Sequence, residues 1–445
     1  MVGIQRQLIV DLAAWRKGPD RKPLLIRGAR QVGKTWAVQE WCRQESLELL
    51  TINFEEKPQL ARLFERDLDI DRIVDDIAMT LSRSLRSPNA VLFLDEIQVA
   101  PKAITALRYF YERRPELVVI AAGSLIEFVL EEHGVPVGRV QSKFVYPLSF
   151  IEFLGAIGRH GLADALSAFR LEELRPFSPV VHEEFLSSLR LYYQIGGMPK
   201  AVSAYLSEKD MRAVANEHAT LIRGYMDDFR KYAKKVDWAL LETIFLKMSA
   251  IAGGPQVKFS AIESQAKSTQ VRRALLALEQ ALIIHKIRPT HAPRLPLVAH
   301  AVDKGFKLAF LDIGLLHHLL GFDWTRIAPD ADLTDIADGR FAEQFVAQEI
   351  ITTRSGLTHY PLHYWNRAQA GSEAEVDFVI EWRNAPAPVE VKSGTKGRLR
   401  SLQLYINELN PPAAFVLSQR NVEKWDRITS LPLYLASRLH DSPAN

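Results

Sequence analysis

The sequence predicts an α/β fold, in which short apolar strands alternate with helices around a parallel sheet. The first observation is that alternation: the stretches "PLLIRG", "LELLTINF", "AVLFLDE" and "LVVIAAGS" between residues 20 and 150 are typical of buried strands, with helical stretches between them. The second is a glycine-rich loop directly after the first strand. The third is the length of 445 residues, which is too long for one core and predicts two or three domains.

The composition excludes several classes of protein. Cys42 is the only cysteine, so a disulfide within the chain is impossible and a thiolate-rich zinc site is excluded. The formal net charge of +3 permits nucleic-acid binding but does not argue for it. The first residues are typical of an amphipathic helix rather than a signal peptide, and no apolar run approaches the ~20 residues of a membrane span. We therefore expect a cytoplasmic protein without a membrane partner.

The stretch "GARQVGKT", residues 28–35, lies between a strand and a helix and predicts a phosphate-binding loop. Gly28 and Gly33 let the backbone wrap the phosphates with its N–H groups pointing inward. Lys34 would reach the terminal phosphates, and Thr35 would offer its hydroxyl to Mg²⁺. We therefore predict a site for ATP and Mg²⁺, whose nucleotide-binding residues include Gly28, Ala29, Arg30, Gln31, Val32, Gly33, Lys34, Thr35 and Trp36.

The strand "VLFLDE" supplies acidic partners for this loop. Asp95 lies at its carboxyl end, where it would hold the Mg²⁺ shell, and Glu96 would polarise an attacking water. Ser124 ends a further strand and would sense the γ-phosphate, although a Gly-Ser turn after a strand is common. Arg139 would act as an arginine finger in a neighbouring subunit, which requires a homo-oligomer; the alternative is a surface arginine.

Six stretches in this order resemble a widespread bacterial and archaeal family: "GARQVGKT", "DEIQVAPKAITALRYFYE", "AAGSLIEFVL", "GRVQSKFVYPLSFIEFL", "YYQIGGMPKAV" and "KLAFLDIGLLHHLLG". Members of that family join an AAA-type P-loop ATPase to a C-terminal domain of unknown function that looks like a PD-(D/E)xK nuclease. The resemblance implies an AAA-like ATPase core, a winged-helix segment and a restriction-endonuclease-like C-terminal α/β domain.

The middle of the chain is expected to be helical and to contain a segment similar to a winged helix-turn-helix. There "FSAIESQA" is the predicted first helix, "QVRRALLALEQA" the second, and "LIIHKIRP" the start of the wing. Gln270, Arg272 and Arg273 lie at the exposed start of the second helix, where DNA contacts would be made. Further charge nearby comes from Lys258, Lys267, Lys286 and Arg288. The alternative is a lid or a partner-binding module.

The stretch "AEVDFVIEWRNAPAPVEVKSG" predicts a second site near the end of the chain. Alternation puts Glu373, Glu375 and Asp377 on one face of a strand, and Glu390 and Lys392 on one face of the next. A hairpin with its two prolines in the loop would bring Asp377 beside Glu390 and Lys392. Mg²⁺ between the carboxylates would relieve their repulsion, and Lys392 would orient a water or stabilise charge. The alternative is an edge hairpin with a solvated charged face.

The resemblance implies that a helical glutamate completes this second site. In "GRFAEQFVAQEI" that residue is Glu343, with Glu349 the weaker candidate. The expected metal ligands are therefore Thr35 and Asp95 at the first site, and Glu343, Asp377 and Glu390 at the second. The residues expected to act in catalysis are Lys34, Glu96, Arg139, Asp377, Glu390 and Lys392.

These predictions divide the chain into four segments: an ATPase core at 1–155, a helical lid or linker at 156–235, a winged-helix-like segment at 236–292 and a nuclease-like domain at 293–445. The leading hypothesis is an ATP-hydrolysing protein that acts on DNA in repair, recombination or defence. Its C-terminal domain would bind duplex or branched DNA with Mg²⁺, and cleavage is a separate question. The alternative is an ATP-dependent switch with a catalytically inactive DNA- or protein-binding module.

Overall fold

A computed structural model describes residues 4–134, 138–229, 237–302, 305–322, 339–354, 356, 358–367, 374–395 and 397–439. The chain forms two compact units. The N-terminal unit consists of Gln5–Tyr146 and Ser355–His359, and the C-terminal unit consists mainly of Pro147–Arg354 and Tyr360–Asn445. The finer division into four segments, with boundaries near residues 155, 235 and 292, stays a prediction.

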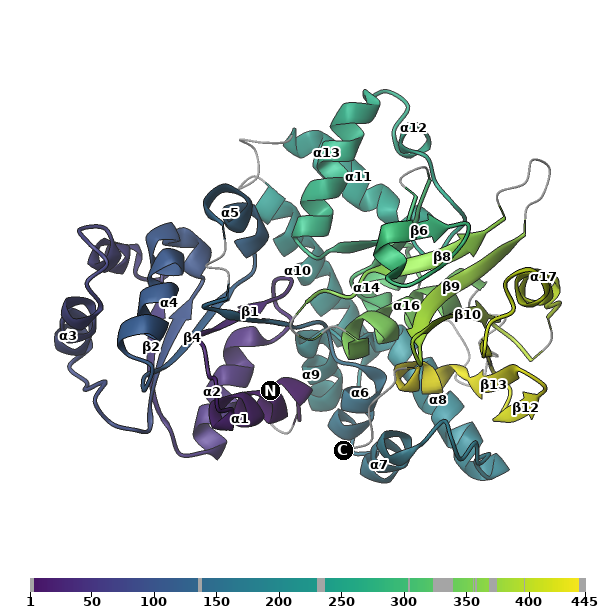
Figure 1. The fold of residues 1–445 in the computed structure, drawn as a ribbon, viewed down its shortest axis with the longest axis horizontal. Coiled ribbons are helices and arrows are strands. Elements are labelled where there is room, and N and C mark those ends of the chain that lie inside the picture. The colour runs from purple at the N-terminus through teal and green to yellow at the C-terminus, as the bar shows by residue number, and fades with distance from the viewer. Residues whose placement is uncertain are drawn as a thin grey trace. The chain divides into compact units, whose positions relative to one another are not determined.

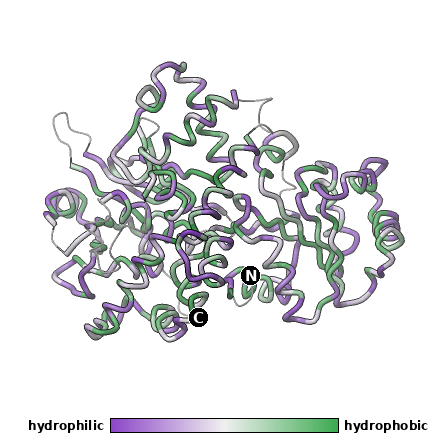
Figure 2. Tube along the Cα trace, turned by 180° about the vertical axis from the view of Figure 1, so that it is seen from behind, coloured by the Kyte–Doolittle hydropathy of each residue, from purple (hydrophilic) through white to green (hydrophobic). Residues whose placement is uncertain are grey.

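The N-terminal unit is built on a parallel sheet of five strands, as the alternating pattern predicts (Figure 1). In space the strands follow the order β2-β3-β4-β1-β5. The inner strands β3 and β4 are buried along their whole length and β1 along most of it, as strands covered on both faces are, and apolar stretches run through this sheet in Figure 2. Their bounds are β1 Leu24–Arg27, β2 Glu48–Asn53, β3 Ala90–Asp95, β4 Val118–Gly123 and β5 Gln141–Phe144.

Helices connect these strands and bury apolar faces against the sheet. In α3 (Ile70–Leu81), Ile70, Ile73, Val74 and Ile77 recur at helical spacing and all lie in the core. The amphipathic helix predicted near the start is confirmed as α1. The remaining helical elements of this unit are α1 Gln7–Lys17, α2 Lys34–Gln44, η1 Pro58–Phe64, η2 Ile97–Val99, α4 Pro101–Arg113 and α5 Ile126–His133.

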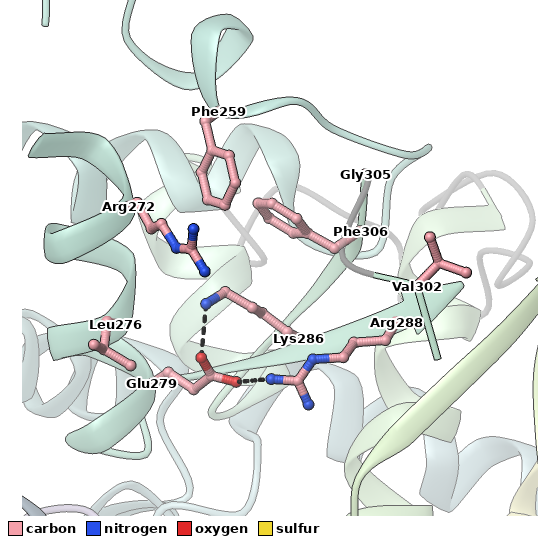
Figure 3. Close-up of a pocket in the computed structure, with 9 residues that line it drawn as sticks. All are labelled: Phe259, Arg272, Leu276, Glu279, Lys286, Arg288, Val302, Gly305 and Phe306. Atoms are coloured by element: carbon pink, nitrogen blue, oxygen red, sulfur yellow. Dashed lines mark hydrogen bonds and ion pairs between the residues drawn. The ribbon is translucent and has the colours of Figure 1, made fainter. Parts of the chain in front are cut away.

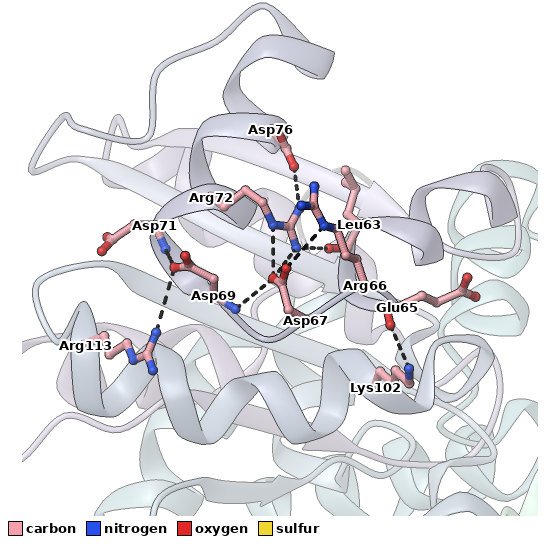
Figure 4. Close-up of polar contacts among 10 residues, drawn as sticks. All are labelled: Leu63, Glu65, Arg66, Asp67, Asp69, Asp71, Arg72, Asp76, Lys102 and Arg113. Carbon is pink, nitrogen blue, oxygen red and sulfur yellow. Dashed lines mark hydrogen bonds and ion pairs between the residues drawn. The ribbon is translucent and has the colours of Figure 1, made fainter.

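A polar network fixes the turn that leads into α3 (Figure 4). The Arg72 guanidinium donates to Asp67 Oδ1 at 2.8 Å, to Asp76 Oδ2 at 2.5 Å and to the Leu63 carbonyl at 3.1 Å. Asp69 caps the helix by accepting a hydrogen bond from the Asp71 N–H. Because one guanidinium joins the end of η1 to the first turns of α3, the chain direction between these elements is fixed.

The C-terminal unit begins with helices, as predicted, and continues with a mixed sheet of eight strands. The helices before the sheet are α6 Phe150–Ala156, α7 His160–Ala168, α8 Pro179–Ile195, α9 Pro199–Glu208, α10 Met211–Phe229, α11 Trp238–Ile251, α12 Phe259–Ile262 and α13 Ser268–Gln280. The later helical elements are η4 Leu297–His300, α14 Ile313–Leu319, α16 Gly339–Arg354, α17 Arg400–Leu409 and η6 Leu433–Arg438.

The strands of the second sheet follow the order β12-β13-β11-β10-β9-β8-β6-β7. Strands β6 and β8 pair in parallel, as do β10 with β11 and β11 with β13, and the other neighbours are antiparallel. The bounds are β6 Ile284–Thr290, β7 Lys307–Phe310, β8 Leu362–Asn366, β9 Glu375–Trp382, β10 Ala385–Val391, β11 Ala414–Ser418, β12 Glu423–Trp425 and β13 Ile428–Pro432.

Two expectations for the middle segment need adjustment. The predicted second helix is present as α13, but the predicted first helix, α12, ends at Ile262 and has four residues. The strand expected to begin a wing, β6, pairs antiparallel with β7 and also runs parallel to β8 in the large sheet. The winged-helix assignment stays a prediction, because β6 is shared with the C-terminal sheet.

The hairpin predicted around residues 374–394 is present, but its turn is shorter than expected. Strands β9 and β10 pair antiparallel around Arg383 and Asn384, which both have positive φ, at 46° and 58°. The expectation that Pro386 and Pro388 occupy a loop is wrong, because both lie within β10. The pairing of β11 with β10 begins only at Val389, so the prolines occupy a stretch where that ladder needs no N–H donor.

Helix α16 is fastened to β7 and α14 by buried amide side chains. Gln344 accepts from the Phe310 N–H at 2.8 Å and donates to the Phe310 carbonyl at 2.8 Å. Gln348 accepts from the Ile313 N–H at 3.0 Å. The glutamine side chains thus satisfy backbone groups of Phe310 and Ile313, and they fix the register of the helix against the strand. As a result, the residue before Gln344, which is Glu343, has a defined position beside β7.

Candidate functional site

The loop between β1 and α2 adopts a conformation suited to an anion. Gln31 and Gly33 have positive φ, at 63° and 93°, and Lys34 begins the helix. Gly28 must lack a side chain, since a Cβ there would lie 2.4 Å from the Val145 carbonyl oxygen. The loop therefore brings backbone N–H groups and a helix N-terminus together at the carboxyl end of β1.

Lys34 is buried within this loop, with 6% of its surface exposed. Its ammonium donates to the carbonyl oxygens of Gly28 at 2.9 Å and Ala29 at 2.8 Å. Burial lowers the pKa of Lys34 to about 8, while the carboxylates of Glu96 and Asp95 oppose that shift. The ammonium thus lies inside the loop, at the place where the phosphates of a nucleotide would be bound.

Arg6, which the sequence analysis did not single out, holds the loop from the other side. It is buried and comes just before α1. Its guanidinium donates to the Val32 carbonyl at 2.8 Å and to the Tyr146 carbonyl at 2.7 Å. A charged residue beside an amphipathic helix gives no sequence signal for this role, because the contact joins residues far apart in the chain.

Asp95 lies at the end of β3 and contacts Thr35. The Thr35 hydroxyl donates to Asp95 Oδ2 at 3.0 Å, and Asn53 Nδ2 donates to the same oxygen at 3.3 Å. Burial, followed by repulsion from Glu96, raises the pKa of Asp95, and the Thr35 hydrogen bond opposes the rise. Asn53 was not predicted, although it ends the strand "LELLTIN" and so had a recognisable position at the same edge of the sheet.

Glu96 follows β3 in a left-handed conformation, with φ of 50°. Its Oε2 accepts from Gln98 Nε2 at 2.6 Å and from Ser124 Oγ at 3.3 Å. A Cβ on Gly123 would lie 2.3 Å from Gln98 Oε1, so the absence of a side chain at Gly123 leaves room for Gln98. The order of the strands explains the arrangement, because β4 lies between β1 and β3 and brings Ser124 beside Glu96.

This set of groups fits a magnesium nucleotide. The Thr35 hydroxyl and the Asp95 carboxylate are oxygen ligands of the kind that Mg²⁺ prefers, and they lie within hydrogen-bond distance of each other. The loop supplies N–H groups and an ammonium for phosphate oxygens. Glu96 has a carboxylate oriented by two neutral donors, as a base for water requires.

Three other residues expected at this site are Arg30, Trp36 and Arg139, and each of the two arginines pairs with a glutamate outside the predicted set. Arg30 pairs with Glu55, with 3.6 Å between Nη2 and Oε2. Trp36 is half-buried on α2. Arg139 donates through Nε to Glu112 Oε1 at 3.0 Å, and its side chain is 47% exposed. The role of Arg139 as an arginine finger in a neighbouring subunit stays a prediction.

The four residues predicted for the second site lie close together in the C-terminal unit. Glu343 lies on α16, Asp377 on β9, and Glu390 and Lys392 on and just after β10. The Lys392 ammonium donates to Glu390 Oε1 at 2.6 Å, and Asp377 Oδ2 accepts from the Val391 N–H at 2.8 Å. The alternative of a solvated edge hairpin is wrong, because β9 and β10 are interior strands and Glu390 is buried.

A further lysine, not predicted from the sequence, lies at the centre of these carboxylates. The ammonium of Lys307, on β7, lies 2.9 Å from Glu343 Oε2, 2.7 Å from Glu375 Oε1 and 3.4 Å from Asp377 Oδ1. We refer to Lys307, Glu343, Glu375, Asp377, Glu390 and Lys392 as the acidic cluster. The one available signal was a lysine at the start of the apolar strand "KLAF". Glu373, also predicted for this face, lies outside the described residues.

The carboxylates of the acidic cluster lie close enough to shift one another's pKa. Burial, and then the Asp377 carboxylate, raises the pKa of Glu343 to about 8 and that of Glu390 to about 7. The carboxylates around it raise the pKa of Lys307 against the opposing effect of burial. Both glutamates therefore hold protons more tightly than free glutamates, which reduces the excess negative charge.

The predicted Mg²⁺ does not fit the acidic cluster in this arrangement. Within the described ranges, no set of three His, Cys, Asp or Glu side chains is disposed to hold a metal ion. Oxygens of two expected ligands, Glu343 and Asp377, are directed instead at the Lys307 ammonium, and the third, Glu390, pairs with Lys392. The site residues come together as expected, but the cation among them is a side chain.

Three of the residues proposed for DNA contact line a small cavity of about 260 Å³ between α13, β6 and the segment before β7 (Figure 3). Arg272, Lys286 and Arg288 line it, and Glu279 pairs with Lys286 at 2.7 Å and with Arg288 at 3.6 Å. Phe259 and Phe306 form part of its wall, with ring centroids 5.0 Å apart. Three cations thus face one carboxylate, which leaves a local excess of positive charge.

Comparison with known families assigns the N-terminal unit. Residues 20–154 match a family model described as an AAA domain. The strand order, the phosphate-binding loop and this match together define a P-loop ATPase domain of the AAA type. Residues 186–326 and 338–435 match two models described as domains of unknown function, DUF8612 and DUF4143. None of these descriptions mentions a nuclease, so the PD-(D/E)xK resemblance stays a prediction.

Solved structures give more distant similarities. One is the Walker-type ATPase paby2304 of Pyrococcus abyssi, at 15% identity over 71% of this chain and 96% of that chain, with a TM-score of 0.44. Another is the Aeropyrum pernix ORC1 protein in complex with DNA, at 14% identity over 71% of this chain and 91% of that chain, with a TM-score of 0.30. A comparison with curated proteins gives no match. No helix among the described residues is both long and apolar enough to cross a membrane.

Proposed function

We propose that the protein hydrolyses MgATP in its N-terminal unit and uses that hydrolysis to control a C-terminal unit that binds duplex or branched DNA. One observation carries the ATPase part: Thr35 contacts Asp95 at 3.0 Å, and the adjacent Glu96 is held by Gln98 and Ser124. Hydrolysis needs a metal ligand set and an oriented base side by side, and this edge of the sheet supplies both.

Each residue of the first site has a defined task in this proposal. Bound Mg²⁺ would neutralise charge on the β- and γ-phosphates, held by the Thr35 hydroxyl and Asp95. Lys34 would move its hydrogen bonds from the Gly28 and Ala29 carbonyls to phosphate oxygens. Glu96 would accept the proton of the attacking water. A homo-oligomer that uses Arg139 in trans, and a cytoplasmic location, belong to the same proposal.

The DNA part is supported by the basic side chains around α13. Arg272 and Arg273 are exposed near the start of that helix, and Lys258 and Lys267 are exposed before it. Such clustering gives a sequence-independent attraction to phosphates that weakens as salt rises. Repair, recombination and defence against foreign DNA are processes in which an ATP-controlled DNA-binding unit would be used.

DNA cleavage by the C-terminal unit is a second candidate function. It is favoured by the convergence of Glu343, Asp377, Glu390 and Lys392 on neighbouring elements. The position of Lys307 favours the other reading, in which this unit is a catalytically inactive DNA- or protein-binding module. We regard the binding module as better supported, because the carboxylates are engaged by a lysine rather than disposed for a metal.

The test combines binding and cleavage on the full-length protein. Duplex, forked and four-way DNA are offered at low and moderate salt, with Mg²⁺ or Mn²⁺ present. We expect binding that weakens with salt and is reduced several-fold by Arg272→Glu, while the exposed control Lys424→Glu on β12 leaves it unchanged. ATP turnover without any DNA binding at low salt would overturn the DNA part and leave the ATPase part standing.

Cleavage is read in the same samples. Products that disappear in both Asp377→Ala and Lys392→Ala would establish the second candidate and reject the inactive module. Products that persist in both variants would indicate a contaminating nuclease. Intact DNA throughout, together with salt-dependent binding, is the result that our leading proposal predicts. Separately, Lys34→Ala should abolish ATP turnover, and retained turnover would contradict the assignment of the loop.

A further inference from the structure

Lys307 is the most fully buried charged side chain of the acidic cluster, with 2% of its surface exposed. It begins β7, where it pairs with Ile287 of β6, and its ammonium lies 5.6 Å from the centroid of the Tyr364 ring. A buried ammonium is costly unless anionic partners satisfy it. Its position is therefore explained only by the carboxylates around it.

The number of partners matches what a lysine ammonium can use. The group has three N–H donors, and three carboxylates approach it, from Glu343, Glu375 and Asp377, at 2.9, 2.7 and 3.4 Å. They come from α16 and β9, two separate elements whose side chains converge on the Lys307 ammonium. The ammonium thus occupies the space between the carboxylates in the way that a coordinated cation would.

Neighbouring contacts keep these partners in place. Gln344 fastens α16 to the Phe310 backbone of β7, which fixes Glu343 beside Lys307. The second oxygen of Asp377 accepts the Val391 N–H at 2.8 Å, so this carboxylate is engaged on both sides. Asp377 therefore cannot turn to another ligand without breaking its contact with the backbone of β10.

A divalent metal and Lys307 would compete for the same oxygens. Mg²⁺ needs oxygen ligands at about 2.0–2.1 Å in a near-octahedral arrangement. The oxygens of Glu343 and Asp377 that would supply these positions are those that contact the Lys307 ammonium. Two cations cannot share the space, so the presence of one excludes the other.

We propose that the Lys307 ammonium is the resident cation of the acidic cluster, that it takes the place of a divalent metal, and that the cluster becomes a divalent-cation site only when Lys307 is removed. The proposal depends on neither ATP hydrolysis nor DNA binding. It also accounts for the difference between Lys307 and Lys392. Among the ion pairs of the described residues, Lys392 has one carboxylate partner, Glu390, whereas Lys307 has three.

The proposal is tested by titrating the full-length protein with Mn²⁺, without nucleotide or DNA, and following free Mn²⁺ by electron paramagnetic resonance. Every sample carries Asp95→Asn, which removes the carboxylate ligand of the first site. With Lys307 present, we expect no uptake of Mn²⁺. Lys307→Met keeps the length of the side chain without its charge, and we expect it to take up one Mn²⁺ per chain. Adding Asp377→Asn should abolish that uptake.

Lys392→Met is the matched control, because it removes a lysine of the same cluster that does not lie between the three carboxylates. It should take up no Mn²⁺, which separates loss of the resident cation from a general loss of positive charge. The proposal would be overturned if the protein that retains Lys307 took up Mn²⁺ and Asp377→Asn abolished that uptake. This measurement needs no variant of Lys307. No uptake by a folded Lys307→Met protein would also overturn it; Lys307→Gln replaces Lys307→Met if circular dichroism shows that the latter is unfolded.

Discussion

Ser124 Oγ donates a hydrogen bond of 3.3 Å to Oε2 of Glu96, the oxygen that also accepts Gln98 Nε2 at 2.6 Å. The two residues are brought together because β4, which Ser124 follows, is the neighbour of β3, which Glu96 follows. The contact holds the carboxylate through neutral donors, so it orients Glu96 without adding a charge. We therefore assign Ser124 and Gln98 as positioning residues for Glu96.

The first prediction concerns these positioning residues. Ser124→Ala should lower kcat for ATP hydrolysis by about tenfold, a fraction of the roughly 10²–10⁴-fold effect of a general base, because Glu96 loses one of its orienting donors. The KM for ATP should change little, since phosphate binding is left intact. Ser124→Thr, which retains the hydroxyl, should restore most of kcat. Equal losses in kcat and in affinity for ATP would indicate a role in nucleotide binding instead.

The second prediction concerns the close approach at Gly28. Gly28→Ala would place a Cβ 2.4 Å from the Val145 carbonyl oxygen, so β1 or the segment after β5 must shift. We expect the free energy of unfolding to fall by about 1–3 kcal/mol, as overpacking usually costs. Gly155→Ala on α6 is the control, since a Cβ there meets no atom within 4 Å. Equal thermal midpoints for the two variants would contradict the model of the loop.

The third prediction is a dependence of stability on pH that arises from Glu349. This side chain is fully buried on α16 and accepts the Phe150 N–H at 2.9 Å, and burial raises its pKa to about 8, with repulsion from Glu152 adding to the rise. Because the folded state binds this proton more tightly than the unfolded state, the contribution of Glu349 to stability is lost as the pH rises from about 4.5 to 8.

Glu349→Gln should remove that loss while keeping an oxygen for the Phe150 N–H. The free energy of unfolding of the variant, relative to the natural protein, should therefore increase across this pH range, by at most about 1.4 kcal/mol per pH unit. Denaturant unfolding at several pH values measures the difference. Curves that stay parallel from pH 4.5 to 8 would show that Glu349 titrates normally.

The N-terminal fold could be predicted because its signals are local. Each apolar strand, the glycine-rich loop and the polar residues after the strands are contiguous in sequence, and parallel strands place their carboxyl ends at one edge. The contacts of Asp95 with Thr35 follow from that rule. The contact of Arg6 with the phosphate-binding loop could not be predicted from that rule, because Arg6 bonds to residues 26 and 140 positions away in the sequence.

The acidic cluster could be predicted only in part, because its centre depends on long-range packing. Alternation placed Asp377, Glu390 and Lys392 on matching faces, but no local pattern showed that β7 would join the same sheet through β6 and β8. Only that pairing brings Lys307 among the carboxylates. The prediction that the prolines of β10 lie in a loop was wrong for a similar reason. Whether a strand tolerates them depends on where its neighbour, β11, begins to pair.

The central claim, that the N-terminal unit hydrolyses ATP with Glu96 as base, is tested most directly by ATP turnover of the natural protein and of Glu96→Gln, measured beside ATP binding. The substituted amide would keep the size of the side chain and an oxygen for the Ser124 hydroxyl, but it could not accept a proton. We predict that the variant binds ATP as the natural protein does and that its turnover falls by about 10²-fold or more. Undiminished turnover by Glu96→Gln would contradict the account.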